Sequence, residues 1–124
     1  MLAVDQVAKA GAAHATTSAH NPDLAFGIAH GPPPVLVALS ILVLGVFLAV
    51  VGRLAVHAGI SPVLPALIAG GMLGNVLDRA RFGAVRDFIH IPFAIINVAD
   101  IAIMIGIVAL GVALPMRARR LLVR

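Results

Sequence analysis

Three long stretches that are nearly free of charge constrain this chain of 124 residues more than any other feature. Val35–Gly52 has 18 residues, Gly59–Leu77 has 19, and neither contains an ionisable side chain. The third stretch, Phe88–Met116, contains only two ionisable residues, His90 and Asp100. A helix that crosses the hydrocarbon core of a bilayer needs roughly 17–25 mostly apolar residues. The pattern therefore predicts three membrane-spanning helices.

We predict one all-α domain over residues 1–124, a polytopic helical bundle in the membrane with spans at 35–52, 59–77 and 94–116. The composition agrees, because 61% of the residues are hydrophobic and 11% are charged. Soluble domains have roughly 45–50% apolar and about 25% charged residues. A soluble fold of this length has too little interior to bury so much apolar surface. The composition therefore excludes an ordinary cytosolic enzyme.

Residue types that are rare or missing exclude two further classes of protein. The chain has no cysteine, which excludes a small secreted module held together by disulfides. Aromatic residues make up 4% of the chain, and neither Trp nor Tyr occurs. Nucleic-acid modules that bind bases by stacking depend on such rings. We therefore expect membrane lipids as partners and no nucleic acid, despite the net charge of +4.

Residues 1–34 contain no stretch long enough to cross a bilayer, and they lack the basic start and apolar core of a secretory signal peptide. We expect Ala8–Ala19 to be weakly helical or irregular and Asn21–Gly31 to be a loop or a short extended piece. Four arginines within the last eight residues favour a cytoplasmic C-terminus, because basic segments stay on the inner side. The N-terminal segment and the charged loop Asp78–Asp87 then both face outward, where they can meet.

The densest polar cluster lies between Gly70 and His90. Gly70 and Gly74 form a small-xxx-small pair, which lets a second helix approach closely. One interpretation is therefore a packing interface that ends in an Asp–Arg pair at the membrane surface. This interpretation does not account for Asn75, an amide within the apolar stretch. His90 could tune Asp87, which lies three residues away, but an interfacial histidine is more often a solvated loop residue.

A second polar pair, Asn97 and Asp100, has the spacing that places both residues on one face of a helix. A charged carboxylate at mid-membrane costs roughly 2.5–3.5 kcal/mol, so such residues point into a bundle or a wet cavity. The alternative is that Asp100 only caps a helix near the interface, where Asp and Asn are both favoured. The same Asn-x-x-Asp spacing at Asn75 and Asp78 favours a polar site.

Paired carboxylates can activate water. When two of them face each other in a partly dry site they share one proton at neutral pH, because like-charge repulsion raises one pKa. The ionised group takes a proton from water while the protonated group polarises a carbonyl, as in aspartic proteases. The sequence has neither an HExxH motif nor a clustered His and Cys set, so we expect no metal and no other cofactor. Spacing alone leaves open which two of Asp78, Asp87 and Asp100 form the pair.

The run GNVLDRARFGAVRDFI, followed by FAIINVADIAIMIG, resembles the signature of the bacterial lipoprotein signal peptidases, also called signal peptidase II. The family pattern is approximately G-N-x-x-D-R-x-x-x-G-x-V-x-D-F and then F-N-x-A-D-x-x-I-x-x-G. Two further fragments resemble its D-Q-x-x-K and N-x-G-x-A-F-G motifs. Four motifs in this order over nearly the whole chain are specific, whereas one alone would not be. The matching residues are Asp5, Gln6, Lys9, Asn21, Ala25, Phe26, Gly27, Gly74, Asn75, Asp78, Arg79, Gly83, Val85, Asp87, Phe88, Asn97, Ala99, Asp100, Ile103 and Gly106.

The resemblance implies an aspartic endopeptidase of the bacterial cytoplasmic membrane, with Asp87 and Asp100 as its catalytic pair and Asp78 as a structural partner. The implied substrate is a prolipoprotein whose lipobox cysteine already carries diacylglycerol. Cleavage just before this cysteine releases the signal peptide. The active site then lies at the outer leaflet, and we expect the protein to act as a monomer. The residues implied to line the substrate cleft are Asn21, Gly71, Asn75, Arg79 and Asn97.

The chain departs from the family pattern in three places. The family has four spans, with D-Q-x-x-K near the outer end of the first, so the resemblance implies that most of this helix is missing before Asp5. Ile96 and Asp23 stand where the family usually has Phe and Gly. The two catalytic candidates are only 13 residues apart. Two alternatives therefore stay open: a truncated, inactive member that binds lipoprotein precursors, and a small membrane assembly or transport subunit.

Overall fold

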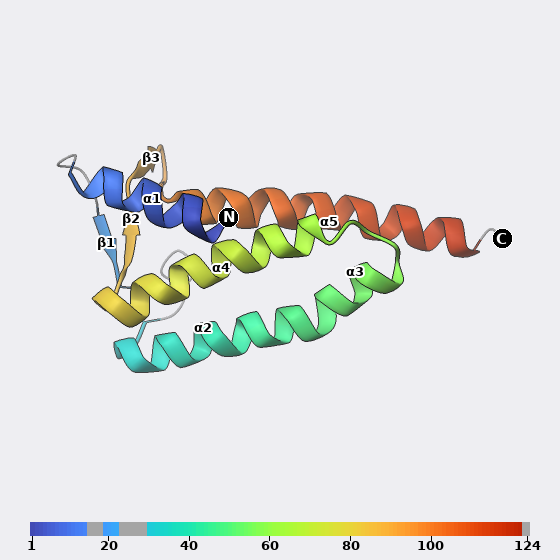
Figure 1. Cartoon of the computed structure of the whole chain (residues 1–124), viewed down its shortest axis with the longest axis horizontal. Helices are drawn as coiled ribbons and strands as arrows, with labels where there is room; N and C mark the ends of the chain where they lie inside the picture. Colours follow the sequence, from blue (N-terminus) through green and yellow to red (C-terminus); the bar gives the residue numbers. More distant parts are fainter. Residues whose placement is uncertain (15–18, 23–29, 123–124) are drawn as a thin grey trace.

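The computed structural model describes residues 1–14, 19–22 and 30–122. In this part of the chain the fold is a helical bundle with two small antiparallel sheets gathered at one end (Figure 1). Helix α4 lies at the centre and packs against α5, α2 and α1. The helices are α1 (Leu2–Ala13), α2 (Pro33–Phe47), the π-helical segment η1 (Leu48–Gly52), α3 (Arg53–His57), α4 (Val63–Phe82) and α5 (Val98–Leu122). The strands are β1 (Ala19–Asn21), β2 (Val85–Asp87), β3 (Ile89–Ile91) and β4 (Ala94–Ile96).

Two helical stretches in the described residues are long and apolar enough to cross a membrane, Pro33–His57 and Val98–Arg117. The first joins α2, η1 and α3, and it begins at a proline because the first helical turn has no intrahelical use for its N–H groups. The prediction of three full spans is thus supported for two of them. Helix α4 has 20 residues but carries Asn75, Asp78 and Arg79, which lower its hydropathy.

The predicted second span, 59–77, differs from α4 at both ends. Gly59 has a left-handed backbone with φ of 63°, so the chain turns there and the helix begins only at Val63. At its other end α4 continues to Phe82, where Gly83 with φ of 73° forms a left-handed C-cap. The charged segment that was expected to be a loop is therefore helical in its first half.

The predicted third span, 94–116, also needs correction. Ala94–Ile96 is strand β4, which pairs with β3 across a turn at Pro92 and Phe93, and α5 begins at Val98. Helix α5 does not stop at Pro115 but continues to Leu122. The run Phe88–Met116 is mostly apolar, and hydropathy does not distinguish a short hairpin from the first turn of a helix.

The N-terminal segment is more ordered than expected. Helix α1 covers 12 residues where weak helicity was predicted from Ala8. Strand β1 pairs with β2, so that Ala19 lies opposite Asp87, and the N-terminal segment does meet the chain after α4, as predicted. Most of the predicted loop Asn21–Gly31 lies outside the described residues. Asp23, one of the departures from the family pattern, lies there too.

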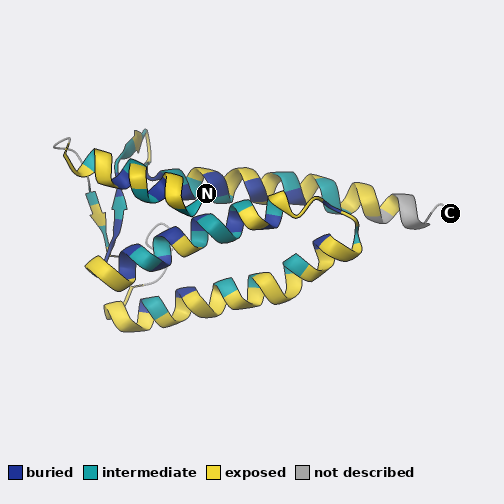
Figure 2. Ribbon diagram, in the orientation of Figure 1, coloured by how far each residue is buried: buried dark blue, intermediate teal, exposed yellow. Residues whose placement is uncertain are grey.

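Apolar side chains are distributed as expected for a bundle in lipid. Figure 2 shows α2 and the second half of α5 exposed over much of their surface, and the exposed residues include Leu42, Val46, Ile105 and Val108. A small apolar core of Ala55, Ile60, Ile68 and Leu110 lies where α3 and α4 meet α5. The buried charged and amide groups lie toward the other end of the bundle, near the strands.

Candidate active site

A cleft of about 390 Å³ lies between α2, α4, α5 and strand β2. Most of its wall is apolar and comes from the three helices, for example from Phe47, Met72 and Ile107. Its polar lining residues are Asn21, Ser40, Asn75, Arg79, Asp87 and Asp100. An apolar cleft with a few converging polar groups is the usual form of a site for a small or extended ligand.

Asp87 ends strand β2 and reaches the cleft with only 3% of its surface exposed. The amide of Asn97 donates to its Oδ1 at 2.6 Å. Burial raises the pKa of Asp87 to about 6, and the negative charge of Asp100 adds to this, whereas hydrogen bonds from Asn97 and Asn21 act in the opposite direction. A carboxyl that keeps its proton this close to neutral pH is suited to proton transfer.

Asp100 stands in the first turn of α5 and makes a reciprocal capping box with Asn97. The backbone N–H of Asp100 donates to Asn97 Oδ1 at 2.9 Å, and the backbone N–H of Asn97 donates to Asp100 Oδ2 at 3.1 Å. The capping interpretation is therefore correct in part. The cap uses only one oxygen of the side chain, because Asp100 Oδ1 accepts from the amide of Asn75 at 2.9 Å and Asp100 also lines the cleft.

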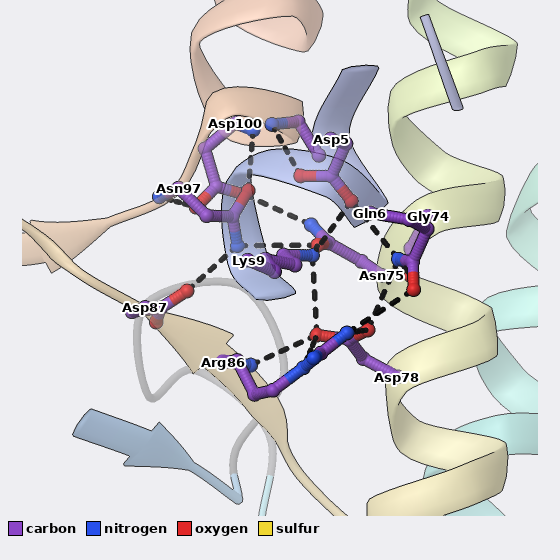
Figure 3. Close-up of polar contacts among 11 residues, drawn as sticks. Asp5, Gln6, Lys9, Gly74, Asn75, Asp78, Arg86, Asp87, Asn97 and Asp100 are labelled. Atoms are coloured by element: carbon purple, nitrogen blue, oxygen red, sulfur yellow. Dashed lines mark hydrogen bonds and ion pairs between the residues drawn. The ribbon is translucent and has the colours of Figure 1, made fainter. Parts of the chain in front are cut away.

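The two amides connect the two carboxylates (Figure 3). Asn97 Nδ2 donates to Asp87 Oδ1 and, at 3.2 Å, to Asn75 Oδ1. Asn75 Nδ2 donates to Asp100. Asn97 thus donates to one carboxylate and Asn75 to the other, and the two amides are themselves hydrogen-bonded to each other. Because the site is buried, such a network holds its members in one arrangement.

Helix α1 contributes a buried ionic cluster next to this network (Figure 3). Lys9 Nζ lies 2.9 Å from Asp5 Oδ2 and 3.2 Å from Asp78 Oδ2, and all three side chains have 0% exposure. Arg86 contacts Asp78 Oδ1 at 2.9 Å, and Gln6 donates to the same oxygen at 3.1 Å. Two cations and two carboxylates balance within the cluster, which is what burial of charge requires.

Five of the seven predicted site residues line the cleft: Asn21, Asn75, Arg79, Asp87 and Asp100. Asn97 is completely buried behind the two carboxylates and acts as their hydrogen-bond partner. Gly71 is placed elsewhere, in the contact between α4 and α5. A Cβ there would lie 2.7 Å from the backbone oxygen of Ala99, so only glycine allows this approach. His90 is exposed on strand β3.

Sequence reasoning did not assign a role to Lys9, Gln6, Arg86 or Ser40. The first two carried a signal, since Asp5, Gln6 and Lys9 lie within one helical turn and form the shortest matching motif. The pairing of Arg86 with Asp78 has no sequence signature. Ser40 is the one hydroxyl in an apolar helix, and it is buried with its oxygen 2.7 Å from the carbonyl of Leu36.

Fold and site together define a helical membrane protein with a paired-carboxylate cleft. The pattern of the Signal peptidase (SPase) II family matches residues 1–116, and the chain therefore belongs to this family. It is 38% identical over 95 residues to the lipoprotein signal peptidase of Moorella thermoacetica, covering 76% of this chain and 63% of that protein. Over 51 residues it is 57% identical to the lipoprotein signal peptidase of Sphingopyxis alaskensis, covering 36% of this chain and 30% of that protein. The chain thus spans less than two thirds of either relative.

Solved structures agree on the fold. A bacterial membrane enzyme solved by the in meso method at 2.3 Å superimposes with a TM-score of 0.76 at 26% identity, over 94% of this chain and 84% of that one. A second, solved at 1.9 Å, gives a TM-score of 0.72 over 91% and 86%. The architecture described above is therefore that of a known membrane enzyme.

Proposed function

We propose that this chain is an aspartic endopeptidase that removes the signal peptide from diacylglyceryl-modified prolipoproteins by cleaving before the lipidated cysteine. Membership of the signal peptidase II family supports the substrate class, and relatives named lipoprotein signal peptidase support it further. The observation that carries the catalytic assignment is the arrangement of two carboxylates, Asp87 and Asp100, in one apolar cleft, linked through the amides of Asn97 and Asn75.

The charges around the cleft favour a pair that holds one proton. Lys9 and Arg86 balance Asp5 and Asp78 within the ionic cluster. Among the described residues Arg79 is then the remaining cation at the cleft, and the charges that act on it are those of Asp100, Asp87 and Asp78. One positive charge balances the pair only when the two carboxyl groups together carry one negative charge.

In the proposed reaction the ionised carboxylate takes a proton from water, and the water oxygen bonds to the carbonyl carbon of the scissile peptide. The protonated carboxyl gives its proton to the carbonyl oxygen, which makes a tetrahedral intermediate. Collapse of this intermediate breaks the C–N bond: the carboxyl that took the proton from water gives it to the cysteine nitrogen, and the other carboxylate takes back the proton of the intermediate's hydroxyl. The products are the signal peptide with a free carboxylate and a lipidated cysteine with a free amino group. The pair returns to its state with one proton.

The remaining lining residues are proposed to hold the substrate. The apolar wall suits the hydrophobic core of a signal peptide and the acyl chains on the cysteine. Asn21 and Arg79 offer donors for backbone carbonyls, and Arg79 also suits a lipid phosphate. We propose that the site lies at the outer leaflet of the cytoplasmic membrane and that the C-terminus is cytoplasmic. Because every partner of the pair comes from one chain, we propose that it acts as a monomer.

A processing assay with a diacylglyceryl-prolipoprotein in lipid vesicles tests the proposal. Asp87→Asn and Asp100→Asn are each expected to lower the rate about 10²–10⁴-fold, because each removes one partner in proton transfer. His90→Asn is the control, since His90 is exposed on strand β3 and does not line the cleft. EDTA is expected to have no effect.

Three outcomes separate the proposal from its alternatives. Cleavage that survives both active-site substitutions contradicts the catalytic pair. A folded, inserted and unsubstituted chain that binds the precursor without cleaving it identifies an inactive family member. A chain that neither binds nor cleaves the precursor leaves the assembly or transport subunit as the better description.

A further inference from the structure

Asn75 must face in one direction for the site to work as proposed. Its Nδ2 donates to Asp100 Oδ1 at 2.9 Å and its Oδ1 accepts from Asn97 at 3.2 Å. If the amide turned over, its oxygen would face the oxygen of Asp100, and its NH₂ group would face another NH₂ group. Both contacts would be repulsive, because a carboxylate only accepts and an NH₂ group only donates.

Two groups that can only donate determine the direction of every hydrogen bond in this network. The backbone N–H of Asp100 donates to Asn97 Oδ1, which leaves Asn97 Nδ2 for Asp87 and Asn75. The ammonium of Lys9 donates to Asn75 Oδ1 at 3.0 Å, which leaves Asn75 Nδ2 for Asp100. An ammonium has three N–H donors and no acceptor, so its contact with an amide identifies the oxygen without ambiguity.

All three donors of the Lys9 ammonium already have partners. Its side chain is completely buried, and its three donors go to Asp5, Asp78 and Asn75. Two of these contacts balance charge, and the third reaches an amide that touches the catalytic pair. Lys9 is not among the residues that line the cleft. It therefore acts on the reaction without lining the substrate cleft, through its hydrogen bond to Asn75 and through its charge.

We propose that Lys9 is a positioning residue, which fixes the Asn75 amide with its donor toward Asp100 and so orients the carboxylate for catalysis. This inference rests on the proposed function. Charged groups face the network from every element around it: Lys9 and Asp5 from α1, Asp78 and Arg79 from α4, Arg86 and Asp87 from β2, and Asp100 from α5. Of this set, Lys9 donates to the oxygen of Asn75, and Asp100 accepts from its nitrogen.

Lys9→Met tests this role because methionine keeps the length of the side chain and removes its charge and its donors. The expected kcat falls about tenfold or more, which corresponds to one lost charge-assisted hydrogen bond. KM is expected to stay within about twofold of its original value, since Lys9 does not line the cleft. The pH–rate profile is expected to move to higher pH, because the positive charge of Lys9 favours the ionised form of the pair.

Gln6→Met is the matched control. Gln6 lies on the same helix and hydrogen-bonds Asp5, Asp78, Arg86 and the carbonyl of Gly74, and none of its hydrogen bonds goes to Asn75. It is expected to lower the thermal midpoint without moving the pH–rate profile. If Lys9→Met and Gln6→Met lose activity with the same pH profile, the role of Lys9 is only structural and the inference is wrong.

A second variant covers the case in which Lys9→Met does not fold, since it leaves two buried carboxylates against one cation. Asp5→Asn combined with Lys9→Met keeps the cluster neutral, and Asp5→Asn alone is its control. The double variant is expected to fold and to lose kcat relative to Asp5→Asn, and an unchanged kcat overturns the inference. Activity that survives Asp87→Asn and Asp100→Asn contradicts the proposed function instead, so the two failures are distinguishable.

Discussion

Asn97 combines structural and chemical tasks in one buried side chain. It caps α5 through its oxygen, and through its nitrogen it contacts Asp87 and Asn75. The same residue thus fixes where the helix begins and how the two carboxylates are linked.

The raised pKa of Asp87 makes a prediction about pH. When Asp87 carries the shared proton, activity falls as pH rises through its pKa of about 6 in the free protein. The alkaline limb of kcat/KM, which reports the free enzyme, is therefore expected near pH 6. Substrate in the cleft displaces water and raises the pKa of Asp87 further. The alkaline limb of kcat is thus expected at higher pH, and measured limbs in the reverse order would contradict this assignment.

For single residues, the sequence was sufficient to identify polar side chains within apolar stretches. Asp100 and Asn75 interrupt apolar stretches, and burying polar groups there is costly unless they have partners, so their importance was visible. Spacing alone did not show that Asp87, rather than Asp78, is the proposed partner of Asp100. This assignment depends on Asp78 being neutralised by Lys9 and Arg86, and the contact with Lys9 joins separate parts of the chain.

Helix α1 has its polar side buried and its apolar side exposed. Asp5 and Lys9 are 0% and 1% exposed, whereas Val4 and Val7 are 61% and 72% exposed. This distribution is opposite to that of a helix on a soluble protein and suits contact with lipid. The small residues of α4 allow the approach, because a Cβ at Gly74 would lie 2.5 Å from Asp5 Oδ2.

The glycine contacts between helices give a prediction at the scale of elements. Gly71→Ala is expected to destabilise the protein by about 1–3 kcal/mol, because its Cβ meets a backbone oxygen that cannot move without shifting the first turn of α5. Thermal unfolding in detergent measures the loss, and processing activity is expected to fall as Asp100 shifts with that turn.

Gly111→Ala is the matched control for this substitution. Gly111 lies in α5, and a Cβ added there would meet nothing within 4 Å, so alanine fits and improves helix propensity. Its thermal midpoint is expected to stay the same or to rise. Equal losses in the two variants would show that the contact between α4 and α5 is not as close as described.

Element boundaries were the least predictable part of the fold. The apolar stretches correctly indicated helices α2 and α5, since hydropathy measures whether a segment can leave water. Hydropathy does not detect the hairpin β3–β4, whose residues are as apolar as those of a helix. The pairing of β1 with β2 depends on residues such as Ala19 and Asp87 that lie far apart in sequence.

Orientation in the membrane is a property of the whole molecule and is open to a direct test. The chain has no cysteine, so single cysteines can be introduced as unique labels. We expect His90→Cys to react with a membrane-impermeant maleimide in intact cells, because His90 is exposed near the proposed outer site. Arg117→Cys, exposed near the other end of α5, is expected to react only after permeabilisation. The opposite labelling pattern would place the site on the cytoplasmic side.

The hydrogen bond from the N–H of Ala99 to Asp5 joins residues 94 positions apart, and Lys9 reaches Asn75 across 66 positions. During synthesis on the ribosome, the helix that supplies Asp5 and Lys9 is made before its partners on α4 and α5. A nascent chain that ends before Ala99 has apolar helices in place but neither the carboxylate network nor the contact that joins α1 to α5. The network of carboxylates can therefore form only after the start of α5 has been made.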